Sequence, residues 1–320
     1  MSLKVPIIDL SSPDRGATAA AIDEALSTVG FLAVVGHGID SELVARMFAA
    51  VGEFFALPLA AKLAVAPTDP RSARGYSYVG ATAQAAAHDE VTATDLNETF
   101  NAGLDPIPDT TYYRAAAEHF PPSIWPDELA HLRDVWGEYL AAMQALAGRI
   151  MGLMATALGL DEHWFDPLID RPMASITANH YPALDHAPAP DQFRGGAHTD
   201  YGTTTVLATD GVPGLQLRDE DGTWAPARPV PGGFHVNTGD MLAHWSGGRW
   251  RSTWHRVVAP PGGPPFPERT SIAYFHSPNA DAVIAPLPGR EADGFAPIAA
   301  GQYLRAKLDR YYLPRASRTP

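Results

Sequence analysis

The sequence contains no cysteine, so it can form no disulfide, bind no metal through thiolates and use no cysteine nucleophile. Any metal site must therefore be built from histidine and carboxylate side chains. Basic residues are also scarce, because 23 lysines and arginines face 36 aspartates and glutamates, which gives a formal net charge of -13. No basic cluster that could bind phosphates is present, and this argues against a nucleic-acid partner.

Long hydrophobic runs are missing too. The segment from Met1 to Leu10 carries Asp9 and lacks the apolar core of a signal peptide. The longest apolar stretch, Ile150 to Leu160, is interrupted by glycine and threonine and is too short to span a bilayer. We therefore expect a cytoplasmic, soluble protein with no membrane partner. Its 46% hydrophobic and 18% charged residues are typical of a folded chain, and 320 residues suffice for a substantial core.

The first 170 residues predict helices mixed with short strands. Val5 to Leu10 and Phe31 to Val35 are typical of strands, and Asp14 to Thr28 of an alanine-rich helix. Apolar side chains at helical spacing predict a second helix from Asp40 to Pro58. The clearest helix is Asp127 to Leu158, where apolar residues recur every three or four positions until Gly159 ends the pattern.

Between these helices the pattern is weaker. Pro67 to Asp95 lacks periodicity, and we expect a long irregular segment over the surface or at a pocket mouth. The stretch from Asp95 to Asn101 mixes polar and aromatic residues. Its composition is compatible with a pocket lining and equally with a solvated loop.

The sequence pattern changes near residue 170. Short β-rich runs separated by Asp-Gly, Pro-Gly and Gly-Gly turns predict a sandwich, barrel or jelly roll. We expect one α+β unit with a mainly β core, divided into a mixed region (1–170), a catalytic β core (171–290) and a C-terminal amphipathic helix (291–320). The predicted strands are Ala174 to Tyr181, Thr203 to Thr209, Gly214 to Leu217, Phe234 to Asn237, Trp254 to Val258 and Thr270 to Phe275.

Candidate metal ligands lie in this second part. His198 and Asp200 stand two positions apart, and in a strand such residues point to the same face. Alone this pair is a weak signal, but His255 on a later strand could complete it. Two histidines and one carboxylate on one face of an octahedron are typical of non-haem Fe(II) oxygenases and leave three positions open. Arg269 and Ser271 share a strand face as well and could bind the far carboxylate of a 2-oxo acid.

The order His198-x-Asp200, His255, Arg269-x-Ser271 resembles the isopenicillin N synthase-like group of Fe(II)/2-oxoglutarate-dependent dioxygenases. The resemblance extends from Val5 to Tyr312. Further stretches that match this family in order are Gly30-Phe31, Gly36-His37-Gly38, Arg74-Gly75-Tyr76, Asn97 to Phe100, Asn179 to Pro182, Gly214 to Leu217, Val236 to Asp240 and Ser277-Pro278-Asn279.

The resemblance implies a double-stranded β-helix, also called a jelly roll and cupin-like, with N-terminal helices backing the sheet. It implies Fe(II) bound by His198, Asp200 and His255, and O₂ and 2-oxoglutarate as co-substrates. The 2-oxoglutarate would be held by Arg269, Ser271 and Tyr181, with Asn179 beside them. It further implies oxidation of a C–H bond in a small molecule, by hydroxylation, desaturation or cyclisation, with release of succinate and CO₂.

Two departures from the family pattern stand out. Gly36 replaces an asparagine, which we interpret as a turn variation. The connection from His255 to Arg269 is long, and we expect it to form an extended hairpin loop. For the substrate we expect contacts with Arg74, Tyr76, Asn97 and Phe100, and an arginine there would suit a carboxylate-bearing substrate of a secondary-metabolic enzyme.

Three alternatives stay open from the sequence. The enzyme could be an oxidase that uses no 2-oxoglutarate, as isopenicillin N synthase does, or a Zn(II) hydrolase on the same ligands. It could also be a non-enzymatic small-molecule binder. The oligomeric state is not encoded in any pattern, and a monomer is compatible with the sequence. We expect purely structural roles for the remaining strand histidines His235, His244 and His276, and for His37.

Overall fold

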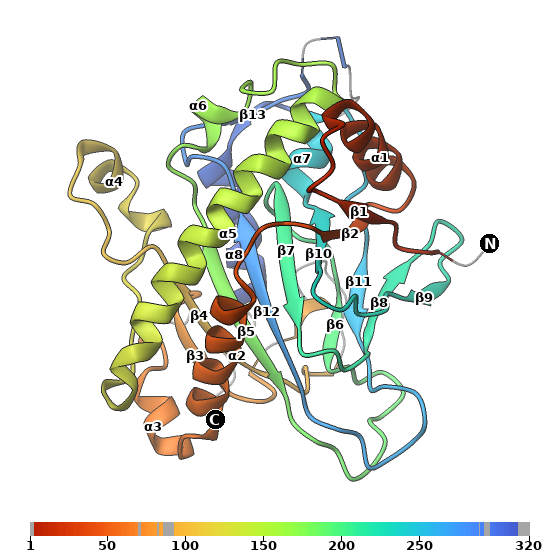
Figure 1. Ribbon diagram of the computed structural model, residues 1–320. Coiled ribbons are helices and arrows are strands. Elements are labelled where there is room, and N and C mark those ends of the chain that lie inside the picture. Colours follow the sequence, from red (N-terminus) through yellow and green to blue (C-terminus); the bar gives the residue numbers. More distant parts are fainter. Residues whose placement is uncertain are drawn as a thin grey trace.

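The computed structural model of the protein describes residues 3–69, 72–81, 83–85, 93–287, 289–290 and 295–312. Two sheets dominate the described part (Figure 1). The large one has the order β1 (Ile7–Asp9), β2 (Phe31–Val35), β10 (Phe234–Thr238), β7 (Thr204–Thr209), β12 (Arg269–His276), β5 (Ser175–Tyr181), β4 (Glu98–Gly103), β3 (Gly75–Ser77). The smaller one has the order β6 (Gly195–His198), β11 (His255–Val257), β8 (Leu215–Arg218), β9 (Trp224–Pro226). A short third sheet pairs β13 (Val283–Ile284) with β14 (Ile298–Ala299).

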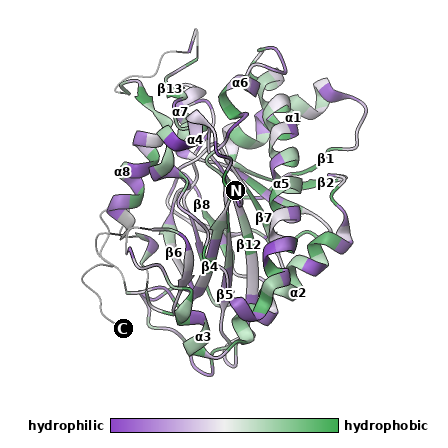
Figure 2. Cartoon of the chain, turned by 90° about the vertical axis from the view of Figure 1, so that its left-hand side faces the viewer, coloured by the Kyte–Doolittle hydropathy of each residue, from purple (hydrophilic) through white to green (hydrophobic). Residues whose placement is uncertain are grey.

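Three helices cover the outer face of the large sheet: α1 (Arg15–Thr28), α2 (Ser41–Ala56) and α5 (Ala130–Ala157). Figure 2 shows them on the right, with α8 (Ala300–Tyr312) at the opposite edge and the sheets between. The shorter helices are α3 (Leu59–Ala64), α4 (Thr111–Ala115), α6 (Asp166–Ile169) and α7 (Asp240–Trp245), and 3₁₀ turns span Ala117–His119 and Asp127–Leu129.

Capping side chains explain where α1 and α2 begin. The Asp14 carboxylate accepts a hydrogen bond from the backbone N–H of Ala17 at 2.9 Å, and that of Asp40 accepts one from Glu42 at 2.9 Å. Each bond satisfies an N–H that has no partner within its helix. Both predicted helices are thereby confirmed to within a residue or two.

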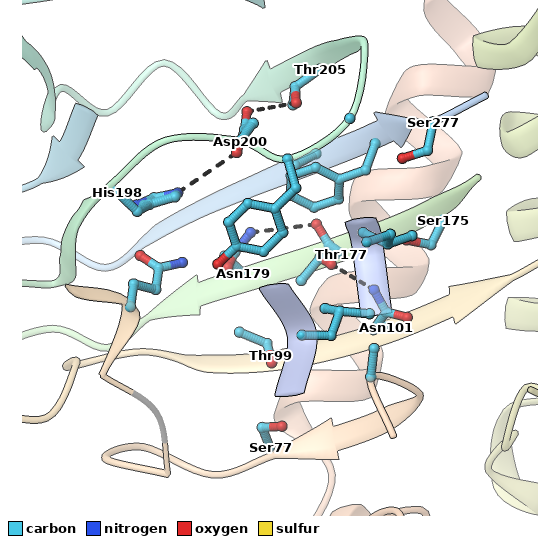
Figure 3. Close-up of a pocket in the computed structure, with 18 of the residues that line it drawn as sticks. Ser77, Thr99, Asn101, Ser175, Thr177, Asn179, His198, Asp200, Thr205 and Ser277 are labelled. Atoms are coloured by element: carbon cyan, nitrogen blue, oxygen red, sulfur yellow. Dashed lines mark hydrogen bonds and ion pairs between the residues drawn. The ribbon is translucent and has the colours of Figure 1, made fainter. Parts of the chain in front are cut away.

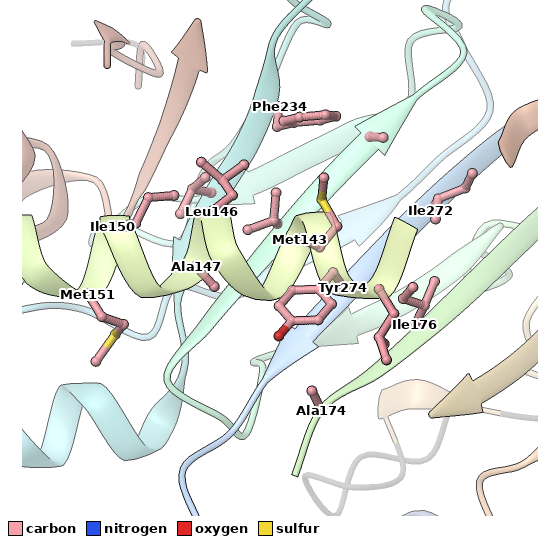
Figure 4. Close-up of a cluster of buried hydrophobic side chains, with 14 of the residues drawn as sticks. Met143, Leu146, Ala147, Ile150, Met151, Ala174, Ile176, Phe234, Ile272 and Tyr274 are labelled. Atoms are coloured by element: carbon pink, nitrogen blue, oxygen red, sulfur yellow. The ribbon is translucent and has the colours of Figure 1, made fainter. Parts of the chain in front are cut away.

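Helix α5 confirms the longest predicted helix, although the first three predicted residues form a 3₁₀ turn. By length and composition alone, Asp127–Ala157 is long and apolar enough to cross a membrane. In the fold it is a core helix, because Met143, Leu146 and Ile150 belong to one buried cluster with the sheet side chains Ile272 and Tyr274 (Figure 4). Burial of this stripe, at about 25 cal/mol per Å² of apolar surface, holds the helix to the sheet.

Several sequence-based expectations need correction. The Asp95 to Asn101 stretch is no solvated loop, because Asn97 and Glu98 are buried and Glu98–Gly103 forms strand β4. Strand β3 lies within the segment expected to be irregular, of which residues 70, 71, 82 and 86–92 fall outside the described part. His244 lies in helix α7 and not on a strand.

The expected hairpin between His255 and Arg269 is also wrong. Strand β11 pairs with β6 and β8 in the small sheet, whereas β12 pairs with β5 and β7 in the large one. The connection therefore crosses from one sheet to the other. Near its end, Phe266 forms an isolated bridge with Leu184, so the loop is supported by the segment that follows β5.

Strand alternation divides the large sheet into two faces. On β5, Ile176 and Ala178 point into the core beneath α5, while Ser175, Thr177 and Asn179 point into a cavity on the other side of the sheet. Strands β2 and β4, from the first 170 residues, pair directly with β10 and β5 from the later part. The cavity wall is therefore assembled from both parts of the chain.

Candidate active site

Three potential metal ligands converge at the small sheet. His198 ends β6 and His255 begins β11, and the two residues face each other across the antiparallel pair. Their ring centroids are 4.2 Å apart. Asp200 Oδ1 lies 3.8 Å from Nε2 of each histidine, and one donor atom from each of the three residues falls within 4.8 Å of the others. This trio lines a cavity of about 630 Å³ between the sheets.

The sequence-based reason for this convergence holds only in part. Asp200 lies beyond the end of β6, so strand alternation does not aim its carboxylate. Its position is fixed instead by hydrogen bonds to Oδ2, one from Thr205 Oγ1 at 2.6 Å and one from Asn237 Nδ2 at 2.7 Å. Because both bonds use Oδ2, Oδ1 is left to face the histidines.

Backbone carbonyls orient the two imidazoles. His198 Nδ1 lies 2.8 Å from the Gly196 carbonyl oxygen, and His255 Nδ1 lies 3.1 Å from that of Thr253. A carbonyl only accepts, so each Nδ1 carries the proton and donates it. The lone pair on each Nε2 then points toward Asp200. The ring edge of Phe31 packs against His255 with centroids 5.3 Å apart and fills the space behind that ligand.

The Asp200 carboxyl is held in its charged form. Burial would raise its pKa, but the positive charge that His255 and His198 carry when protonated and the hydrogen bonds from Asn237 and Thr205 lower it below its ordinary value. A deprotonated carboxylate with two neutral Nε2 donors is a donor set that fits Fe(II) and leaves room for further ligands.

A cationic pocket lies next to this site. Arg269 is 1% exposed; its Nη1 donates to Ser271 Oγ at 3.1 Å and its Nε to the Val212 carbonyl at 3.2 Å. Tyr181 faces Arg269 in the β5–β12 register, and the guanidinium lies 4.9 Å from the tyrosine ring centroid. Asn179 faces Ser271 in the same register. All four side chains line the cavity that holds the metal ligands.

Arg194 is a second buried cation near this pocket, and sequence reasoning missed it. It has no exposed surface, and its Nη2 donates to the carbonyls of Pro182 at 3.2 Å and Pro267 at 2.8 Å. Within the described residues its Nε and Nη1 have no hydrogen-bond partner. Burial, and then the charge of Arg269, lower its pKa. Because the two positive charges disfavour each other, an anion bound in the pocket would be favourable to both.

Polar side chains form another wall of the cavity (Figure 3). Asn101 links two strands, since its Nδ2 donates to Thr177 Oγ1 at 2.7 Å and its Oδ1 accepts from Arg74 Nη1 at 2.6 Å. Among the residues described, several wall hydroxyls have no hydrogen bond to protein and are available to a ligand. We call all the small polar residues on this side of the cavity, whether hydrogen-bonded or not, the polar wall; it consists of Ser77, Thr99, Asn101, Ser175, Thr177 and Ser277.

Two of the four residues expected to contact substrate do line the cavity. Arg74 and Asn97 border it, and Asn97 Nδ2 donates to Asn179 Oδ1 at 3.3 Å. Tyr76 and Phe100 do not, which corrects that expectation. They pair with each other across β3 and β4 and point into the core, where the Tyr76 hydroxyl donates to Glu98 Oε2 at 2.5 Å and Phe100 packs on Phe54.

The C-terminal helix α8 closes one side of the cavity with Leu304, Arg305 and Leu308, which no sequence motif marked as functional.

The four histidines that we expected to have structural roles make protein contacts that suit such roles. His37 and His235 each bond a backbone carbonyl, His244 stacks on Phe295, and burial lowers the pKa of His276 to about 4. None of these four lines the cavity.

Two family models match the chain. Residues 5–128 match the N-terminal region described as "non-haem dioxygenase in morphine synthesis", and residues 173–278 match the 2OG-Fe(II) oxygenase superfamily. Among characterised relatives, the validamycin A dioxygenase of Streptomyces hygroscopicus subsp. limoneus is 36% identical over 296 residues, which cover 90% of this chain and 80% of that protein. A 2-oxoglutarate-Fe(II) type oxidoreductase of Emericella nidulans is 32% identical, covering 96% and 90%.

Solved structures show the same likeness over the whole fold. A full-length Neurospora crassa protein in complex with α-KG superposes with a TM-score of 0.83 at 31% identity and covers 95% of both chains. The complex of that protein with α-KG and thymine gives 0.82 at 32% identity, covering 95% of this chain and 96% of that one. The double-stranded β-helix expected from the sequence is thereby confirmed, with helices on one face of the large sheet and a metal-ligand trio at the small one.

Proposed function

Since the chain belongs to the 2OG-Fe(II) oxygenase superfamily, we propose that His198, Asp200 and His255 are its iron ligands and that Arg269 and Ser271 bind the distal carboxylate of 2-oxoglutarate. The protein is an Fe(II)- and 2-oxoglutarate-dependent dioxygenase that acts on a small molecule. The observation that carries the residue assignment is the convergence of three donor atoms within 4.8 Å on the cavity that Arg269 also lines.

Bound Fe(II) supplies O₂ activation, in which 2-oxoglutarate is converted to succinate and CO₂ and a substrate C–H bond is oxidised. The chain's own residues prepare this reaction. Thr205 and Asn237 fix the Asp200 carboxylate, and the Gly196 and Thr253 carbonyls fix the imidazoles. Arg269, assisted by the nearby charge of Arg194, provides a positive end to the cavity, and Tyr181 and Asn179 complete its wall.

For the substrate we propose a small polar molecule with several hydrogen-bonding groups. The polar wall supports this, because its hydroxyl and amide groups face the cavity and can hydrogen-bond to a ligand there. A carboxylate among the substrate's groups is a further part of this proposal, because Arg74 borders the wall as a cation. Thymine, which the second Neurospora crassa structure contains, is likewise small and rich in hydrogen-bonding groups.

The assignment is tested by anaerobic titration with Fe(II) and 2-oxoglutarate, followed by a panel of polar small molecules read out as succinate formation. Succinate in a 1:1 ratio to oxidised product is expected. Product formed without succinate would instead favour the oxidase that uses no 2-oxoglutarate. Asp200→Ala should abolish substrate-dependent succinate formation, and retained formation would contradict the role of Asp200. The cytoplasmic location and a place in secondary metabolism stay predictions from the sequence.

A further inference from the structure

Asp240, the first residue of α7, connects three separate parts of the chain. Its Oδ2 accepts a hydrogen bond from Tyr303 Oη at 3.0 Å and lies 2.9 Å from Lys307 Nζ, both on α8. Its Oδ1 accepts from Ser252 Oγ at 2.6 Å, three residues before His255. Its backbone N–H donates to the carbonyl oxygen of Asp200 at 2.8 Å. One residue therefore contacts the C-terminal helix and the segments that carry two metal ligands.

The residues just before Asp240 explain how it comes so close to the ligand loop. A Cβ at Gly239 would lie 2.3 Å from the Gly202 carbonyl oxygen, so only glycine allows this approach. Two positions earlier, Asn237 binds the Asp200 side chain. The stretch from Asn237 to Asp240 thus holds Asp200 by its carboxylate and by its backbone.

On the other side, Asp240 fastens the part of α8 that faces the cavity. Tyr303 and Lys307 are four residues apart and so share one helix face, while Leu304, Arg305 and Leu308 line the cavity. The start of α8 is held separately, by hydrogen bonds from Ala300 and Gly301 N–H to the carbonyls of Ala282 and Ala280. Lys307 Nζ also lies 5.5 Å from the ring centroid of Tyr201, the cavity residue that follows Asp200.

We propose that Asp240 is a positioning residue that couples the docking of α8 over the substrate cavity to the geometry of the metal-ligand segment Asp200–Gly202. This rests on Asp200 being a metal ligand. Metal binding restricts the motion of that segment. Asp240 is thereby held in place, and its contacts with Tyr303 and Lys307 then restrict the motion of α8. Because such coupling is reciprocal, a docked α8 must also favour metal binding. The substrate cavity is then closed on the side of α8 when the metal site is filled.

Hydrogen exchange on the full-length protein tests the coupling without a substrate. Anaerobic Fe(II) with 2-oxoglutarate should slow the exchange of backbone amides both in residues 198–202 and in α8, the latter on the order of tenfold. In Asp240→Asn, metal-free α8 should exchange on the order of tenfold faster than in the wild type. Residues 198–202 should still respond to Fe(II) in this variant, whereas α8 should no longer respond.

A second variant can test the coupling if Asp240→Asn fails to fold. The double change Tyr303→Phe with Lys307→Met removes the α8 side of the contacts and leaves His198, Asp200 and His255 in place, and it should weaken Fe(II) binding by about threefold to tenfold. Asp309→Asn is the matched control, because it removes the acidic partner of Arg305 on α8 without touching Asp240. It should leave the Fe(II) response of α8 intact.

Three outcomes would overturn the proposal. The first is a wild-type α8 that ignores Fe(II) while residues 198–202 are protected. The second is an Asp240→Asn protein whose α8 responds as the wild type does. The third, no protection of residues 198–202 by Fe(II), would overturn the metal assignment as well, so the two failures are distinguishable.

Discussion

Arg269→Met offers the sharpest test of the co-substrate pocket. The substitution removes the guanidinium, which lies over the Tyr181 ring, but keeps an apolar side chain of similar length. Among the residues that the structure describes, Arg269 donates hydrogen bonds to Ser271 and the Val212 carbonyl, and neither carries a charge that could neutralise it. We therefore expect the compensating anion to be the distal carboxylate of 2-oxoglutarate.

The magnitude follows from the burial of Arg269. Removing one partner of a buried, hydrogen-bonded charge pair costs about 2–4 kcal/mol, which corresponds to a Kd for 2-oxoglutarate ~30- to 700-fold higher. Calorimetric titration of the anaerobic Fe(II) protein measures this directly. The comparison ligand is 2-oxopentanoate, which has the same carbon chain without the distal carboxylate. Its affinity should be weak and the same in both proteins.

The control variant is Arg256→Met. Arg256 neighbours His255, but its guanidinium stacks over Trp224, and its Nε donates to Gln216 outside the cavity lining. Its removal should leave 2-oxoglutarate binding unchanged. The reasoning would be refuted if Arg269→Met bound 2-oxoglutarate as tightly as the wild type, or if it lost affinity equally for both 2-oxo acids.

Three further predictions follow from side chains around the site. Asn237→Ala should weaken Fe(II) binding ~10- to 100-fold by freeing the Asp200 carboxylate, as measured by competition with a chelator, and an unchanged affinity would contradict its orienting role. Thr99→Val should leave the melting temperature unchanged, but it should raise KM for the substrate, once identified, about 5- to 30-fold, because the Thr99 hydroxyl faces the cavity. An equal KM in the variant and the wild type would show that Thr99 does not contact the substrate. Burial acts to raise the pKa of Glu98, but hydrogen bonds from His180, Lys62 and Tyr76 lower this pKa overall. The stability that the Glu98 carboxylate contributes is therefore present above the ordinary glutamate pKa and is lost as the pH falls through the pKa of the folded protein. Glu98→Gln should thus lower the free energy of unfolding by about 3–5 kcal/mol near pH 7, with the deficit shrinking below about pH 4.5 in urea titrations; a pH-independent deficit would contradict this.

The convergence of His198, Asp200 and His255 could be predicted from the sequence, because their residue types, their order and their β-rich surroundings are visible in it. The phase of β3 and β4 could not. Whether Tyr76 or Ser77 faces the cavity depends on pairing between β3, β4 and β5, which lie far apart in the sequence. Aromatic residues drew attention there, yet the small polar residues between them line the cavity, because the aromatic ones complete the core beneath α2 and α5.

Two other features depended on tertiary structure in the same way. The length of the Ala259 to Pro267 connection suggested a hairpin, but length does not reveal that β11 and β12 belong to different sheets. Arg194 carries no motif of its own, and only its burial beside Arg269 marks it. Asp240 belongs to a stretch that resembled the family, but its contacts with α8 appear only when residues 240 and 303 are brought together by the fold.

The two parts of the chain supply different sets of residues to the cavity. The proposed metal ligands and the proposed 2-oxoglutarate residues all come from one continuous later region, whereas Ser77, Thr99 and Asn101 of the polar wall come from the earlier one. Recombination between relatives near residue 130 would therefore exchange much of the substrate wall while leaving the oxidation chemistry in place. Phe31 sets the limit of such modularity, because it comes from the exchanged half and packs directly on His255.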